Sequence, residues 1–167
     1  PTLTQEFVSM GDIETNASIG LPDAQQLGIA DRIETNDRRL LDAVWHNHSI
    51  WCTFQIERNG LTKAYWVKLR TVSSAELAVF ADGGAIAAED IAGNGTSTLY
   101  PALAINSRGI VVFGFSASAP TIYAGAYVTL RDDVNDPKGM VRGSQVVQEG
   151  LAPYKRYYGK PENRWGD

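Results

Sequence analysis

The feature that most constrains this fold is an internal repeat with a period of about 60 residues. The segment LDAVWHNHSIWCTFQ (41–55) aligns with PALAINSRGIVVFGF (101–115) at an offset of 60 residues. Further on, YWVKLR (65–70) aligns with AYVTLR (126–131) at an offset of 61. The alignment pairs Trp51 with Val111, and one residue inserted in a loop accounts for the change in offset. Two matches in the same order indicate a duplicated structural unit.

Each repeat unit is rich in strand-like runs. Runs of β-branched and aromatic residues, such as SIWCTFQI and IYAGAYVTLR, are separated by Gly, Asn, Asp and Ser, which is typical of strands and turns. Adjacent apolar residues, as in IVVF, predict strands that are covered on both faces. Each unit therefore predicts three apolar strands followed by a more polar outer strand.

A four-stranded meander that recurs in this way predicts an all-β fold made of β-propeller blades. A β-sandwich also has short strands and frequent turns, but it does not require a repeat. Residues 1–30 are predicted to be an N-terminal arm or linker, and 31–167 to be blades, with boundaries near 31–95 and 96–160 and the start of a third blade after them. Because a closed propeller has typically about 4–8 blades, we expect this chain to be part of a larger or multi-chain propeller.

Three segments resemble a known group of proteins. They are RIETNDRRLLDAVWHNHSIWCTF, LYPALAINSRGIVVFGFSASAPTIYAGAYV and the terminal NRWGD. They are similar to stretches of bacterial secreted or cell-surface β-propeller proteins and, more distantly, of sialidase-type propellers. The resemblance covers 31–167 and implies a propeller fold and an extracellular or cell-surface location. The repeat, the open ring and the missing catalytic set favour a binding or structural module, whose partners are other chains or further blades. Gly109-Ile110 departs from the Gly-Asp of that group.

Charge and composition argue against several classes of partner and of covalent structure. A net charge of −4 disfavours nucleic acid as a partner, because neutralising phosphates requires clustered Lys and Arg. No apolar run approaches the roughly 18 residues that would span a bilayer as a helix. The single cysteine, Cys52, excludes an internal disulfide and is expected to be a buried small hydrophobic residue.

His46 and His48 flank Asn47 and form a His-x-His pair that could bind a metal. The chain contains no third histidine, and the repeat aligns HNHS with NSRG, which has turn chemistry. A hairpin turn is therefore favoured over a metal site. Trp45 and Trp51 are expected to pack within the blades.

The segment RDDVNDPKG (131–139) carries Asp132, Asp133 and Asp136, whose oxygens are ligands of the kind that Ca²⁺ prefers. Pro137 falls where the calcium loop of an EF-hand would place a ligand. A solvated turn is favoured, so that no cofactor is expected, and Ca²⁺ is the alternative.

The C-terminal segment YKRYYGKPENRW (154–165) interleaves aromatic and basic residues. Aromatic and cationic side chains together can stack on sugars or contact another protein. The same residues can also pack across the junction between blades, and packing is favoured. The candidate binding residues are Arg156, Tyr157, Tyr158, Arg164 and Trp165.

A sialidase-like glycoside hydrolase is the alternative function. Such an enzyme needs several arginines for a substrate carboxylate, and a tyrosine nucleophile with carboxylate partners. Arg70 and Arg131 align in the repeat, which favours a local structural role for both. Asp42, inside an apolar strand, is expected to be a structural tie. The remaining candidates are Arg39, Tyr65, Tyr127 and the Glu89-Asp90 pair.

Overall fold

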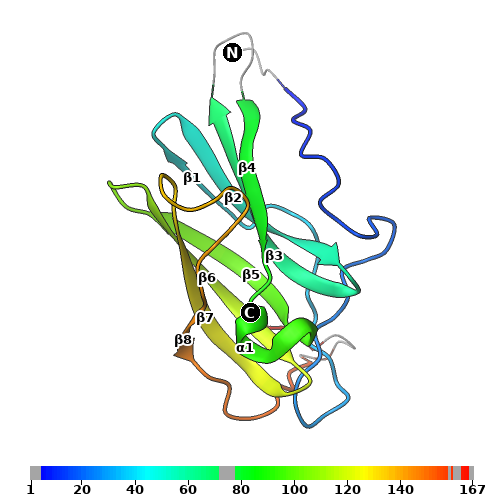
Figure 1. The fold of residues 1–167 in the computed structure, drawn as a ribbon. Helices are drawn as coiled ribbons and strands as arrows, with labels where there is room; N and C mark the ends of the chain where they lie inside the picture. Colours follow the sequence, from blue (N-terminus) through cyan, green and yellow to red (C-terminus); the bar gives the residue numbers. More distant parts are fainter. Residues whose placement is uncertain (1–4, 72–77, 158, 160–162, 166–167) are drawn as a thin grey trace.

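The fold consists of two four-stranded antiparallel sheets, one after the other along the chain (Figure 1). This computed structural model describes residues 5–71, 78–157, 159 and 163–165. The all-β prediction is confirmed, and the described residues form two sheets without a closed ring. The elements are β1 (Asp42–His46), β2 (Ser49–Arg58), β3 (Leu61–Thr71), β4 (Ala78–Ile86), α1 (Glu89–Ala92), a 3₁₀ turn (Gly93–Gly95), β5 (Ser97–Ile105), β6 (Ile110–Ala119), β7 (Ile122–Asp132) and β8 (Gln145–Gln148).

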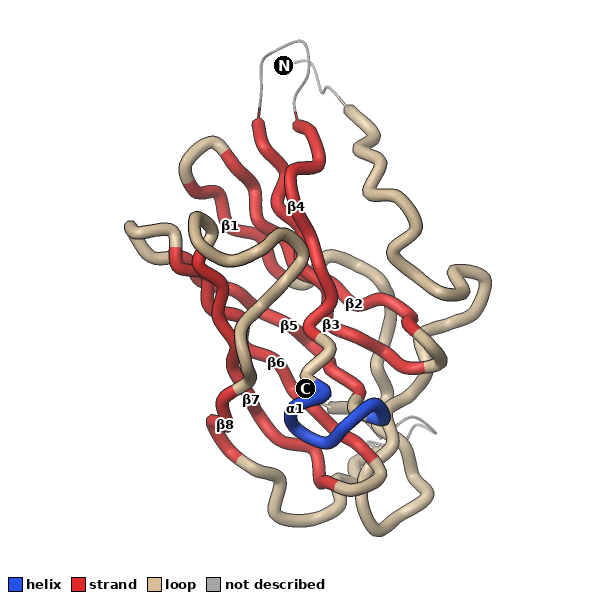
Figure 2. Tube along the Cα trace, in the orientation of Figure 1, coloured by secondary structure: helices blue, strands red, loops and turns tan. Residues whose placement is uncertain are grey.

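Within each sheet the strands follow sequence order, β1-β2-β3-β4 and β5-β6-β7-β8, as the repeat predicts. Figure 2 shows how little helix connects them. The link between the sheets consists of α1 and the 3₁₀ turn. Among the described residues no helix is long and apolar enough to cross a membrane.

The first hairpin of each sheet corrects the alignment of the repeat. In the first sheet His46 pairs with Ser49, whereas in the second sheet the Asn106 amide donates to the Ile110 carbonyl at 3.1 Å. The second turn is therefore one residue longer, and the inserted residue lies here. In the structure Trp51 corresponds to Val112, not to Val111 as the sequence alignment predicted.

This register shows that the two sheets are stacked in the same sense. Trp51 belongs to the core between the sheets, whereas its counterpart Val112 is 40% exposed on the far side of the second sheet. Cys52 lies on the far side of the first sheet, whereas its counterpart Phe113 belongs to the core between the sheets. Equivalent faces thus point in one direction, because neighbouring residues of a strand project to opposite faces.

Aromatic side chains fill the space between the sheets. The Trp66 indole is fully buried, 5.5 Å from the Trp51 ring and 5.8 Å from the Phe113 ring. Phe115 and Tyr127 continue this cluster at 6.2 Å from each other. The prediction that Trp45 packs within a blade is wrong, since its side chain is 63% exposed next to the hairpin turn.

Hydrogen bonds also join the two sheets. The Asp42 carboxylate accepts from the Leu103 amide at 2.9 Å, which confirms the expected structural tie. The Thr53 hydroxyl donates to the Pro101 carbonyl at 3.0 Å. A further tie lies near the link, where the Thr98 hydroxyl donates to the Ile86 carbonyl at 2.7 Å. These contacts hold β5 against the first sheet.

A buried ion pair joins β4 to β7. Arg131 donates to the Asp82 carboxylate at 2.6 Å, and the two side chains are 2% and 8% exposed. The predicted equivalence of Arg70 and Arg131 is wrong, because Arg70 is exposed to solvent. A second register shift, between Ala117 and Ala119, makes Leu69 the counterpart of Arg131. Arg131 therefore projects into the core between the sheets, where its guanidinium lies 4.9 Å from the Trp66 ring.

The segment before β1 packs against both sheets. Met10 and Ile13 cover the far side of the first sheet, where they contact the cluster that contains Phe54 and Tyr65. Figure 1 shows this segment in dark blue, running beside the first sheet. Farther along, the residues of an isolated antiparallel bridge between Ala24 and Ile33 are fully buried against the second sheet.

Candidate functional site

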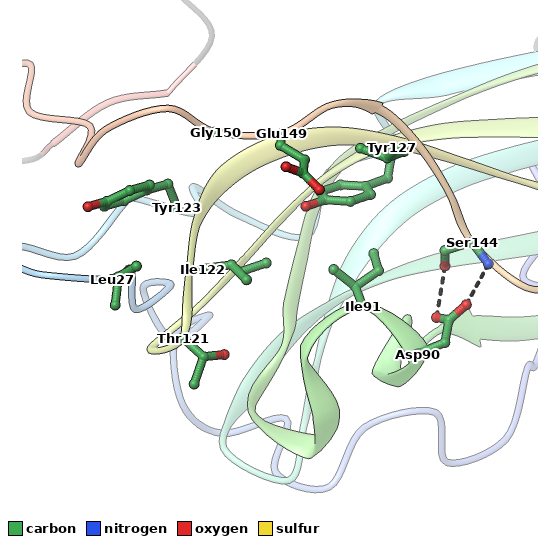
Figure 3. Close-up of a pocket in the computed structure, with 11 residues that line it drawn as sticks. Leu27, Asp90, Ile91, Thr121, Ile122, Tyr123, Tyr127, Ser144, Glu149 and Gly150 are labelled. Atoms are coloured by element: carbon green, nitrogen blue, oxygen red, sulfur yellow. Dashed lines mark hydrogen bonds between the residues drawn. The ribbon is translucent and has the colours of Figure 1, made fainter.

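A pocket of about 420 Å³ lies where the edge of the second sheet meets α1 (Figure 3). We call it the tyrosine pocket, because Tyr123 and Tyr127 of β7 form part of its wall. Its volume is within the range of small-molecule sites. Besides the two tyrosines its lining comprises Leu27, Asp90, Ile91, Thr121, Ile122, Ser144, Val146, Glu149 and Gly150.

Three parts of the chain position these side chains. The Leu27 amide donates to the Ile122 carbonyl at 3.0 Å, which fixes the N-terminal segment to the start of β7. Asp90 of α1 accepts from the Ser144 amide at 2.6 Å and from the Ser144 hydroxyl at 3.0 Å. The two hydrogen bonds from Ser144 to Asp90 hold α1 beside the residues that lead into β8. The pocket is therefore built by contacts between distant segments.

Tyr127 and Glu149 lie side by side in this pocket (Figure 3). Burial raises the pKa of the Tyr127 hydroxyl, and the nearby Glu149 carboxylate raises it further. Tyr127 is only 7% exposed, and its hydroxyl makes no hydrogen bond to any residue that the structure describes. The tyrosine thus remains a neutral hydroxyl at neutral pH. It can donate or accept a hydrogen bond within the pocket.

Only part of this pocket could be found from the sequence. Tyr127 and Asp90 were candidates for a sialidase-like site, and the structure brings both into the pocket wall. Glu149 was missed, since it follows a short exposed edge strand and carries no local signal. Of the other candidates, Tyr65 and Glu89 line a different cavity, of about 710 Å³, and Arg39 pairs with Asp37 at the surface.

That larger cavity contains a buried lysine that sequence analysis also missed. Lys63 is 5% exposed, and its ammonium donates to the carbonyls of Ala87 and Thr96 at 3.0 and 2.5 Å. Burial lowers the pKa of Lys63, and the Glu89 carboxylate opposes this shift. Because both acceptors flank the link between the sheets, Lys63 holds that link in place.

The histidine pair lies at a hairpin turn, as the repeat predicts. Asn47 and His48 have φ of 45° and 56°, the left-handed pair that a two-residue hairpin requires. His46 lines a small cavity of about 150 Å³ that His48 does not reach. Lys68 and Arg108 also line it, and two cations oppose a bound metal ion.

The three aspartates of the 131–139 loop are engaged by donors of the protein. Asp132 accepts from the amides of Val134 and Asn135, and its pKa is lowered chiefly by the Asn135 side chain. Arg142 donates to Asp136 and lowers its pKa. Asp133 pairs with Lys68 at 2.6 Å. Across the described ranges, no three His, Cys, Asp or Glu side chains converge as metal ligands would.

The C-terminal candidates lie against the N-terminal segment and the second sheet. The Trp165 indole donates to the Ser116 hydroxyl at 2.8 Å, and the Arg164 guanidinium lies 3.7 Å from the Glu34 carboxylate. Tyr157 hydrogen-bonds to the Asp31 carboxylate, which raises the pKa of that tyrosine. The Arg156 amide donates to the Asn163 side chain at 2.6 Å. Tyr158 lies outside the described residues.

The exposed side of the second sheet is the other candidate surface. We call it the outer face and define it by Ala102, Ala104, Val112, Gly114, Ala126, Val128 and Leu130. These residues alternate along β5, β6 and β7 with the side chains of the core, and none of them is charged. Trp165 lies at one end of this face, beside Ser116. An apolar sheet face of this kind typically marks an interaction surface.

Comparison of the chain with models of known families, with curated proteins and with solved structures found no match. The function is therefore inferred from the geometry of the chain and from the resemblance stated above.

Proposed function

We propose that this protein is a binding and structural module made of β-propeller blades, whose outer face packs against a further four-stranded sheet. That sheet belongs to another part of a larger propeller and, where this chain stands alone, to a second copy of it. The resemblance to secreted and cell-surface propellers supports an extracellular or cell-surface location. As a binding module it would take a glycan or another protein as its ligand.

The observation that carries the proposal is the stacking of equivalent faces in one direction. The face of the first sheet that contains Trp51 is covered by the second sheet. Its counterpart on the second sheet contains Val112 and is open. Sheets stacked in one sense can continue to add neighbours, as blades do around a propeller. Two sheets facing each other in a sandwich would instead bury one common core and leave no equivalent open face.

The residues of the outer face fit such a neighbour. Ala104 and Val112 are opposite each other across β5 and β6, and Gly114 and Val128 are opposite each other across β6 and β7. Small side chains leave room for bulky ones, of the kind that Trp51 and Trp66 present to the second sheet. An uncharged apolar surface favours packing over solvent exposure.

The glycoside hydrolase alternative has less support. Within the described part of the chain, no arginine or lysine lines the tyrosine pocket, although a sialidase-like site requires cations for a substrate carboxylate. The raised pKa of Tyr127 also opposes its use as a nucleophile at neutral pH. Arg131, a candidate from the sequence, is occupied by Asp82 in the core.

Sedimentation velocity over a range of protein concentrations tests the proposal. The wild-type chain is expected to self-associate through the outer face. Val112→Lys is expected to weaken this association at least about tenfold, because a lysine buried without a partner costs a few kcal/mol. Val134→Lys makes the same exchange at an 81% exposed loop residue and should associate as the wild type does. A wild-type chain that stays monomeric at every concentration, or a Val112→Lys variant that associates equally, would contradict the proposal.

A further inference from the structure

We propose that the tyrosine pocket binds a primary alkylammonium group, such as the end of a lysine side chain or a small alkylamine. This inference is independent of the packing of further sheets. It rests on the charge of the pocket, on its aromatic wall and on its apolar side.

The described lining of the pocket carries negative charge. Asp90 and Glu149 are its acids, and among the residues that the structure describes no Lys, Arg or His lines it. Asp90 is already engaged by Ser144. The Glu149 carboxylate makes no hydrogen bond or ion pair with any part of the chain that the structure describes. A cationic ligand would supply the missing partner, and an anionic ligand would be repelled.

The second observation is the Tyr127 hydroxyl. The side chain is more than nine-tenths buried, yet its hydroxyl has no hydrogen-bond partner among the described residues. In Figure 3 the hydroxyl lies beside the Glu149 carboxylate, on the wall of the pocket. The hydroxyl oxygen itself is open to the pocket, so that a bound ligand can reach it. An ammonium group can donate to the Tyr127 hydroxyl and to Glu149 together, since it carries three donors.

The rest of the lining suits the alkyl part of such a ligand. Leu27, Ile91 and Ile122 give the pocket an apolar side (Figure 3). Tyr123 adds a second aromatic ring, and aromatic faces attract cations. A short alkyl chain with a terminal ammonium therefore matches the pocket better than a polyol, which would leave this apolar side uncovered.

Isothermal titration calorimetry with n-pentylamine tests the inference, with n-pentanol as the neutral probe of similar shape. Saturable binding of the amine is expected, weakened by added salt, with little binding of the alcohol. Glu149→Gln should weaken amine binding at least about tenfold, because it removes the charge that pairs with the ammonium. Tyr127→Phe keeps the ring and should weaken binding about two- to fivefold.

Asp12→Asn is the matched control, since it removes one negative charge from an exposed residue that does not line the pocket. Its affinity for n-pentylamine should equal that of the wild type. The inference is overturned if the amine fails to saturate a site. It is also overturned if pentanol binds equally well, or if Asp12→Asn loses as much affinity as Glu149→Gln, since the binding would then be non-specific.

Discussion

Replacing Asp82 with alanine is expected to lower the free energy of unfolding by about 3–5 kcal/mol, because it leaves Arg131 buried without a counter-charge. The Arg131 side chain is 2% exposed, and Asp82 is the carboxylate that pairs with it. The other Asp82 oxygen accepts from the Gly139 amide at 2.8 Å, so that the loop before β8 is also released. Urea denaturation followed by tryptophan fluorescence measures the change.

Two further variants show whether the loss of stability comes from the burial of this ion pair or would follow from breaking an exposed ion pair as well. Asp37→Ala breaks the ion pair between Asp37 and Arg39, whose side chains are 45% and 68% exposed, and should change the stability far less than Asp82→Ala does, because solvent screens exposed charges. The double variant Asp82→Ala/Arg131→Met removes both buried charges and should recover much of the loss. Equal losses for Asp82→Ala and Asp37→Ala would show that the buried pair does not hold the sheets together.

Replacing Trp66 with alanine is expected to destabilise the protein by about 3–5 kcal/mol, because it opens a cavity between the two sheets. Trp66 is 0% exposed and contacts Trp51, Phe113 and the Arg131 guanidinium. The surrounding rings belong to two separate sheets, which limits how far the site can collapse. Chemical denaturation reports the loss, and circular dichroism checks that the variant remains folded.

Trp45→Ala is the matched control for this substitution. Its side chain is 63% exposed beside the first hairpin, so that the change should cost about 0.5 kcal/mol or less. A Trp45→Ala variant as unstable as Trp66→Ala would contradict the assignment of the core to the junction between the sheets. Both variants remove an indole, which makes the comparison independent of residue type.

The strands and hairpins could be predicted from the sequence, because their signals are local. Runs of β-branched residues mark β2 and β6, and Asn47 marks a turn that needs a left-handed residue. The repeat then predicts two similar meanders. The alignment placed its one inserted residue after β6, whereas that residue lies in the turn between β5 and β6. A shift of one residue exchanges the two faces of a strand, so that the same error misplaced the partner of Trp51.

Contacts between distant residues could not be predicted. Arg131 and Asp82 are 49 positions apart, and the position of Arg131 in the repeat suggested equivalence with an exposed arginine. The tyrosine pocket likewise depends on Leu27, on α1 and on residues after β8. Such sites form only when separate segments pack, and no local pattern of residues marks them.

Thiol labelling of Ala104→Cys tests whether the outer face of the second sheet packs against another sheet. Ala104 is exposed on that face in β5. The native Cys52 is buried, and burial raises the pKa of its thiol, as does the Asp42 carboxylate. Cys52 should therefore react slowly with maleimide throughout and not obscure the reporter.

The rate of labelling is measured in dilute and in concentrated protein. We expect Ala104→Cys to react at least about tenfold more slowly in the concentrated sample, because association covers the outer face. Ser107→Cys, in the exposed hairpin turn, should react at the same rate in both samples. Equal rates for Ala104→Cys at all concentrations would contradict the claim that this face is an interface.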